Sequence, residues 1–301
     1  MNIDLTIGGF TIRIGEPNGY PQLAWPLRPF ETFLSDKNLL VDLDVEVNIV
    51  PHLPELETGE LRFDSGRGLW RLFDSDEGYV LESLHTLTLQ PRVRAHVSYD
   101  YRTVRAWILP ELMGGQVGWC PMYLFNPIVE VCFLSLLANA GGLLLHASGL
   151  SHHGQAFVFT GPSGAGKSTI AQFFADRGAV VLSDERILLR PQDSTMFLHG
   201  TPWVGSGEYA ANGKAPLTAL YAIQHGTDRH TIAPMAQSQA MSMLMQQAFL
   251  PHWDRDGMER TLDTLMRLTT TIPAVRLSAL KQPDVVEAVQ GHTSSLATTV
   301  A

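Results

Sequence analysis

The sequence predicts a two-part protein in which an α/β core follows a β-rich N-terminal region. Apolar and polar residues alternate over residues 43–49 and again over 93–108, which is typical of strands with one solvated face. From Asn126 onwards, short apolar runs are separated by segments with helical periodicity, which is typical of α/β proteins. A glycine-rich stretch at residues 161–169 lies between one such run and one such helix.

These patterns also predict the domain boundaries. We expect a β-rich domain with antiparallel strands over residues 1–118 and an α/β domain over residues 119–290. Residues 291–301 carry no packing pattern, so they are expected to form a loose C-terminal tail.

The α/β part can be read in order along the chain. Helices are expected from Pro127 to Gly141 and at residues 167–177, 238–249 and 257–269. Apolar runs predict strands at residues 143–149, 156–160, 179–183, 187–190, 217–223 and 274–277.

Composition and charge exclude several classes of protein. The 301 residues carry a net charge of −9 with no Lys/Arg-rich stretch, so neither nucleic acid nor an anionic membrane is expected as a partner. The most apolar run, residues 131–138, is too short to span a bilayer. Cys120 and Cys132 lack zinc-site spacing, and we expect buried free thiols in a soluble, cytoplasmic protein.

The stretch GPSGAGKST matches the phosphate-loop pattern G-x-x-x-x-G-K-[ST]. Glycines allow the backbone N–H groups to turn inward around phosphates, while the lysine reaches the β and γ phosphates and the Ser168 hydroxyl binds Mg²⁺. The preceding strand and following helix are the context that this motif requires. The sequence therefore predicts ATP binding by Gly161, Pro162, Ser163, Gly164, Ala165, Gly166, Lys167, Ser168 and Thr169.

An acidic pair follows the next buried strand. An ABC-type ATPase would share the GPSGAGKST stretch, but its LSGGQ-like signature is absent. Instead, Asp184 and Glu185 end the strand at residues 179–183, and a strand beside that of the loop would bring them to the γ phosphate. From these residues alone, the pair could equally cap a turn, and the upstream His146 could be a core histidine.

The stretch LLLHASGLSHHGQAFVFTGPSGAGKSTIAQFFADRGAVVLSDERILL resembles the catalytic core of bacterial HPr kinase/phosphorylase and its shorter relatives. Those relatives include kinase-like proteins encoded beside peptide-modification genes. The resemblance rests on the loop, on His146, on Arg177 with Gly178, and on the acidic pair. It implies a P-loop core with the fold of phosphoenolpyruvate carboxykinase.

The resemblance also implies roles for individual residues. Asp184 would be the base for a substrate hydroxyl, His146 would assist at the phosphates, and Glu185 would join Ser168 at Mg²⁺. The downstream metal-binding Glu of the family has no counterpart in residues 197–205, so Glu185 and Glu208 both stay open for that role.

The resulting prediction is an HPr kinase-like serine/threonine kinase, which transfers the γ phosphate of ATP to a Ser or Thr hydroxyl of a small protein or peptide. A kinase of a small hydroxylated metabolite and an inactive nucleotide-binding regulatory protein are the alternatives. The sequence identifies neither the acceptor, nor the role of the β-rich region, nor whether phosphorolysis occurs. It also leaves the oligomeric state open, although the related kinases form homo-oligomers.

Overall fold

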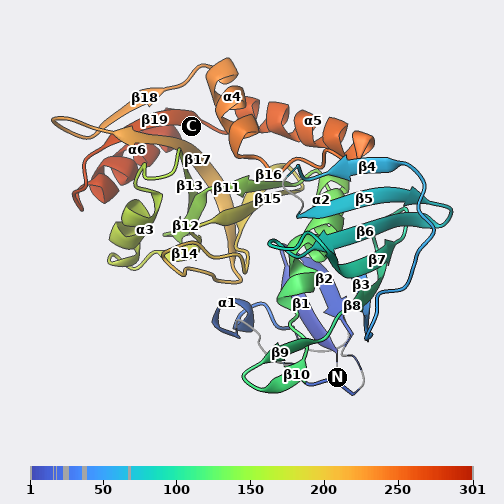
Figure 1. The fold of residues 1–301 in the computed structure, drawn as a ribbon. Helices are drawn as coiled ribbons and strands as arrows, with labels where there is room; N and C mark the ends of the chain where they lie inside the picture. Colours follow the sequence, from blue (N-terminus) through green and yellow to red (C-terminus); the bar gives the residue numbers. More distant parts are fainter. Residues whose placement is uncertain are drawn as a thin grey trace. The chain divides into compact units, whose positions relative to one another are not determined.

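The chain is described by a computed structural model at residues 2–299, except 16, 18, 23–26, 36–38 and 67–68. It divides into two compact units (Figure 1). Unit 1 comprises Met1–Arg28, Leu34–Asn139 and Pro251–Met258, and unit 2 comprises Pro29–Phe33, Ala140–Leu250 and Glu259–Ala301.

Unit 1 is built on an eight-stranded sheet with the strand order β1-β2-β3-β8-β7-β6-β5-β4. Its strands are β1 (Ile3–Ile7), β2 (Phe10–Ile14), β3 (Leu43–Ile49), β4 (Leu61–Asp64), β5 (Trp70–Ser75), β6 (Gly78–Leu84), β7 (Pro91–Val97) and β8 (Thr103–Ile108). A separate hairpin joins β9 (Glu111–Met113) to β10 (Gln116–Gly118). The short helix α1 (Leu27–Glu31) begins in unit 1, and its residues 29–31 belong to unit 2.

The predicted period-two pattern is confirmed in this sheet, since β3 buries Leu43, Val45 and Val47 and exposes Asp44 and Glu46. The expectation of antiparallel strands throughout is wrong. Strand β3 pairs in parallel with both β2 and β8. The connection at residues 15–42 is long enough to bring the chain from β2 back into β3 in the same direction.

A buried helix completes unit 1. The helical segment η1 (Leu124–Val129) leads into α2 (Glu130–Asn139), of which residues 131–138 are all buried. Phe133 meets Phe10 of β2 edge-on with ring centroids 5.5 Å apart, and Ser135 accepts a hydrogen bond from Trp253 Nε1 at 3.1 Å. These contacts explain why residues 119–139 group with the β-rich part and not, as the sequence suggested, with the α/β part.

Unit 2 contains a nine-stranded mixed sheet with the order β11-β15-β16-β17-β13-β12-β14, in which β19 pairs with β17 and β18. Its strands are β11 (Leu143–His146), β12 (Ser148–His152), β13 (Gln155–Thr160), β14 (Val180–Ser183), β15 (Arg186–Gln192), β16 (Thr195–His199), β17 (Lys214–His225), β18 (Thr231–Pro234) and β19 (Ala274–Ala279). Strand β17 is parallel to β13 and β19, and the other pairings are antiparallel.

Helices cover both faces of this sheet. Helices α3 (Lys167–Ala175) and α6 (Val285–Thr299) pack on the face that carries Phe157 and Phe159 of β13. Helices α4 (Gln237–Gln247) and α5 (Arg255–Thr271) contribute to the core on the face that carries Val158. Because alternate residues of β13 enter different cores, unit 2 has the layered α/β arrangement that the sequence predicts.

The expected loose tail is instead helical, since α6 continues to Thr299. Val285, Val286 and Val289 are fully buried, and Leu296 packs against the same core. This apolar face holds the serine- and threonine-rich end in a helix. Val300 and Ala301 lie outside the described residues.

Two further expectations concern the whole chain. Cys120 and Cys132 are free and buried, as predicted. Among the helices in the described part of the chain, none is long and apolar enough to cross a membrane.

Candidate functional site

Two breaks between consecutive strands lie side by side in unit 2. Strand β11 continues into β12 with only Ala147 between them, and β14 continues into β15 through Asp184 and Glu185. The N–H group of Ala147 donates a hydrogen bond to the Glu185 carbonyl oxygen at 3.1 Å. The strand breaks therefore bring His146, the last residue of β11, next to the acidic pair.

The acidic pair reaches the glycine-rich loop by a different route from the one expected. Strand β14 pairs with β12 and not with β13, the strand that precedes the loop. Because β12 is antiparallel to both, β13 and β14 run in the same direction and their carboxyl ends meet at one edge of the sheet. Inserting β12 between them thus preserves the expected proximity.

The loop that connects β13 to α3 has glycines where the backbone needs them. Gly164 and Gly166 have φ angles of 80° and 103°, in the region that residues with a side chain rarely adopt. Gly166 is also the N-cap of α3, and no side chain caps the helix. The free N–H groups and the positive dipole end of α3 therefore face the loop, an arrangement that favours anions.

A cavity of about 480 Å³ joins the loop to the acidic pair. The loop and the first turn of α3 line it with six residues, and the strand breaks add three more. Ser206 and Lys281, which no sequence motif indicates, complete the lining. The set comprises His146, Ser163, Gly164, Gly166, Lys167, Ser168, Thr169, Asp184, Glu185, Ser206 and Lys281.

Asp184 is held by the backbone of the loop at residues 204–208. The carboxylate is only 2% exposed. Its Oδ1 accepts a hydrogen bond from Gly205 N–H at 2.9 Å, and its Oδ2 accepts one from Gly207 N–H at 2.6 Å. Each carboxylate oxygen has a second lone pair, so Asp184 can accept a further hydrogen bond or proton while its position stays fixed.

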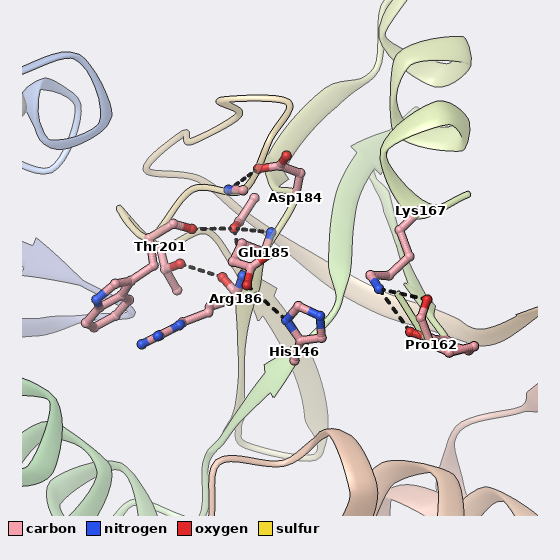
Figure 2. Close-up of polar contacts among 11 residues, drawn as sticks. His146, Pro162, Lys167, Asp184, Glu185, Arg186 and Thr201 are labelled. Atoms are coloured by element: carbon pink, nitrogen blue, oxygen red, sulfur yellow. Dashed lines mark hydrogen bonds and ion pairs between the residues drawn. The ribbon is translucent and has the colours of Figure 1, made fainter. Parts of the chain in front are cut away.

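Glu185 and His146 form the more accessible part of the site, with side chains 38% and 35% exposed. His146 Nδ1 lies 3.2 Å from Glu185 Oε1, and Figure 2 shows the imidazole ring pointing toward this carboxylate. The pairing orients the ring, because a carboxylate at one ring nitrogen fixes which nitrogen is available on the other side. His146 is therefore half-buried at the site and not a core histidine.

Hydrogen bonds around the strand break fix this geometry. The Ser183 hydroxyl donates to the Trp203 carbonyl at 3.0 Å and accepts from the N–H groups of Glu185 and Arg186 at 3.3 and 3.2 Å. Thr201 donates to the Arg186 carbonyl (Figure 2). The turn that presents the acidic pair is thus tied to the segment that holds Asp184.

Lys167 folds back on its own loop. Its ammonium group donates to the Gly161 carbonyl at 2.9 Å and lies 3.5 Å from the Pro162 carbonyl, as Figure 2 shows. Burial lowers the pKa of Lys167, and the negative charge of Glu185 opposes that shift. The lysine is thus a partly desolvated cation near the start of the loop, which increases its attraction to a bound anion.

Other candidates from the sequence lie elsewhere. Ala165 is buried and lines no part of this cavity, and Gly161 and Pro162 line a neighbouring one. Glu208 is exposed and is not among the lining residues.

The donors that do line the cavity suit a hard cation. Mg²⁺ in nucleotide sites is held by one or two carboxylates together with phosphate oxygens and water. Within the described residues there is no cluster of three or more His, Cys, Asp or Glu side chains that could hold a metal. Glu185 and the Ser168 hydroxyl, which both line this cavity, are groups that could share Mg²⁺ with a bound triphosphate.

Unit 1 contains a cavity of about 520 Å³, lined among others by Glu57, Asp74, Asp76 and Glu77. These carboxylates would repel a triphosphate. The candidate phosphate site is accordingly the cavity in unit 2.

Comparisons with known proteins identify a family that this chain matches. Residues 122–281, just over half of the chain, match the family model described as SynChlorMet cassette protein ScmC. No curated protein matches the chain. Among solved structures, the HPr(Ser) kinase/phosphatase from Coxiella burnetii is 12% identical and is covered over 93% of its length and 52% of this chain, with a TM-score of 0.32. A TM-score this low supports no conclusion about this chain.

Proposed function

This chain belongs to the family of the SynChlorMet cassette protein ScmC, and from this premise and the geometry of unit 2 we propose that it is an ATP-dependent phosphotransferase. One observation carries the proposal: Lys167, Ser168, Asp184 and Glu185 line a single cavity although they come from separate parts of the fold. Phosphoryl transfer needs this combination of a phosphate cradle, a cation and a carboxylate.

In the proposed reaction, a substrate hydroxyl oxygen attacks the γ phosphorus of ATP. The new O–P bond forms while the bond from the γ phosphorus to the β–γ bridging oxygen breaks, and its electron pair leaves with ADP. The hydroxyl proton passes to the carboxylate of Asp184, which the Gly205 and Gly207 N–H groups hold in place. Lys167 and the N-terminus of α3 neutralise the phosphate charge.

Mg²⁺, when bound, supplies further charge neutralisation at the β and γ phosphates. The Ser168 hydroxyl and the Glu185 carboxylate would hold it, and the contact with His146 helps to orient that carboxylate.

We further propose that the acceptor is a Ser or Thr hydroxyl of a small protein or peptide. The family description calls ScmC a cassette protein, which directs the search for acceptors to proteins and peptides encoded beside this chain.

The central test combines the purified chain with Mg²⁺, γ-labelled ATP and those cassette products. We expect Asp184→Asn to lower transfer by about 10²- to 10⁴-fold, the usual contribution of a general base, with the Kd for ATP changed far less. Asp263→Asn removes an exposed carboxylate of α5 and serves as the control. If Asp184→Asn binds ATP and transfers phosphate as fast as the parent, Asp184 is not the base.

The same assay separates the alternatives. Label on a small hydroxylated metabolite, with none on any peptide or protein, would indicate a metabolite kinase. Tight ATP binding without ADP formation under any acceptor would indicate a nucleotide-binding regulatory protein.

A further inference from the structure

A second cavity, of about 370 Å³, lies beside the proposed phosphate site in unit 2. It shares His146 and Ser163 with the first cavity. The rest of its lining comes from the start of the glycine-rich loop and from the end of α4, namely Gly161, Pro162, Gln246, Gln247, Ala248 and Phe249. Two cavities thus meet at one histidine and one serine.

The position of Lys167 indicates which end of a bound triphosphate would face this second cavity. In phosphate loops of this kind, the lysine reaches the β and γ phosphates. Its ammonium group lies at the Gly161 and Pro162 carbonyls, and both of these residues line the second cavity. On the proposed function, the transferred phosphate therefore lies on the side of the loop that faces the second cavity.

An acceptor must approach from that side. The attacking oxygen and the leaving oxygen lie roughly in line through the phosphorus in phosphoryl transfer. The leaving ADP extends along the loop toward Thr169, which lines only the first cavity. The attacking hydroxyl then comes from beyond Ser163, and it passes from the second cavity into the first, which Lys167 and Asp184 line.

The second cavity also differs from the first in the charge of the side chains that line it. The first is lined by two lysines and two carboxylates, whereas His146 is the only titratable side chain among the described residues that line the second. No described residue forms a hydrogen bond with the side-chain amides of Gln246 and Gln247. Adjacent amides that both donate and accept match the N–H and C=O groups of an extended peptide.

The wall that carries these glutamines is fixed to the sheet. Ala248 forms a β-bridge with Leu145, and Phe249 N–H donates to the Leu144 carbonyl at 2.9 Å. The Arg186 guanidinium lies over the Phe249 ring, 4.7 Å from its centroid. A preformed wall lowers the entropic cost of binding a flexible segment.

We propose that the second cavity binds the Ser- or Thr-bearing segment of an uncharged, extended acceptor peptide, and that Gln246 and Gln247 bind its main chain. This inference rests on the proposed function and adds to it the substrate class and the side of entry. Gln246 and Gln247 are thus specificity-determining residues.

A kinetic experiment tests the assignment. The probe is a degenerate peptide pool with one fixed central Ser and no other hydroxyl or charged side chains, used with Mg²⁺ and γ-labelled ATP. Replacing both amides (Gln246→Ala with Gln247→Ala) is expected to raise the peptide KM roughly tenfold or more, because two hydrogen bonds are lost, with the Kd for ATP within about twofold. Gln237→Ala, at the other end of α4, should leave both values unchanged.

A crosslinking experiment gives a readout that does not depend on transfer. Gln247→Cys and, as its control, Gln237→Cys are labelled with a benzophenone maleimide, which the buried Cys120 and Cys132 should not take up. With Mg²⁺ and a non-hydrolysable ATP analogue, the peptide pool should crosslink to position 247 and not to position 237.

The outcomes separate the two proposals. Crosslinking at position 247 without any phosphate transfer by the parent would refute the proposed function and keep the peptide site. Transfer with an unchanged KM and no selective crosslink would refute the peptide site alone. A Kd for ATP that rises in step with the peptide KM would instead assign the cavity to the nucleotide base, and the absence of both transfer and crosslinking counts against both proposals.

Discussion

At the residue scale, the site depends on the close approach of the backbone at positions 205 and 207 to the carboxylate of Asp184. A Cβ atom at position 207 would lie 2.7 Å from Asp184 Oδ2, and one at position 205 would lie 3.1 Å from the same atom. A side chain at position 207 would therefore push the loop away from the carboxylate. Glycine at this position allows the N–H group to hold Asp184.

We therefore predict that Gly207→Ala impairs transfer by displacing Asp184. Displacements of about 1 Å at a reacting group cost up to roughly 10²-fold in rate, so we expect kcat to fall at least tenfold while the Kd for ATP changes less than threefold. Gly291→Ala is the matched control, because a Cβ at Gly291 meets no atom within 4 Å. A parent-like kcat for Gly207→Ala would show that this contact does not position the base.

Some residues of the site could be predicted from the sequence, and others could not. The loop was readable because each of its residues has a fixed role at a fixed spacing. Lys281 and Ser206 carry no such spacing and reach the cavity only through the fold. No pattern in the sequence indicated that the N–H groups of Gly205 and Gly207 would bind Asp184.

At the element scale, the sequence predicted where strands and helices occur better than how strands pair. The apolar pattern of an element indicates which of its residues are buried, and β13 is buried from Ala156 to Thr160, as its apolar run predicts. It contains no information on neighbours, so the insertion of β12 between β13 and β14 could not be read from it. The apolar face of α6 was missed because serines and threonines separate its last apolar residues.

A buried histidine on β16 leads us to predict how the stability of the protein depends on pH. His199 is 6% exposed, and its Nε2 atom has no hydrogen-bond partner within the described residues. Burial, together with the charges of Lys214 and Arg190, lowers its pKa from 6.5 to about 4. The unfolded chain therefore binds a proton at His199 more tightly than the folded chain does. The contribution of His199 to stability is fully present above pH 6.5 and is lost as the pH falls toward 4.

Between pH 7 and pH 5, the protonation of His199 should lower the free energy of unfolding by about 2 kcal/mol. We expect His199→Gln to lose less stability over that interval than the parent, measured by urea unfolding at both pH values. His225→Gln, which replaces an exposed histidine on β17, is the control. Equal losses for His199→Gln and the parent would mean that His199 does not titrate on unfolding.

At the scale of the whole molecule, the chain consists of two units with separate sheets. All the residues of the proposed phosphate site and peptide site lie in unit 2. The sequence predicted a β-rich part and an α/β part, but it placed α2 in the wrong one. The apolar run at residues 131–138 indicates that α2 is buried, and it does not show which sheet buries it.

Because the proposed site lies in unit 2, we can predict which strands a bound nucleotide stabilises. A ligand that binds the folded state stabilises it by about 2.7 kcal/mol at a concentration 100 times its Kd. We expect ATP with Mg²⁺ to slow hydrogen exchange in peptides from β13 and β17 by up to roughly 100-fold, which is the same free energy. Peptides from β3, β7 and β8 of unit 1 should exchange at unchanged rates, because no residue of the proposed site belongs to that sheet.

The Lys167→Met variant provides the control, since it removes the cation that the phosphates need while an apolar side chain of similar length remains. The protection of β13 and β17 by ATP should then disappear. Protection that persists in this variant, or that appears equally in β3, would place nucleotide binding outside the loop of unit 2 and would contradict the proposed site. Because hydrogen exchange reports binding without turnover, it distinguishes a nucleotide-binding protein that lacks an acceptor from a chain that binds no nucleotide at all.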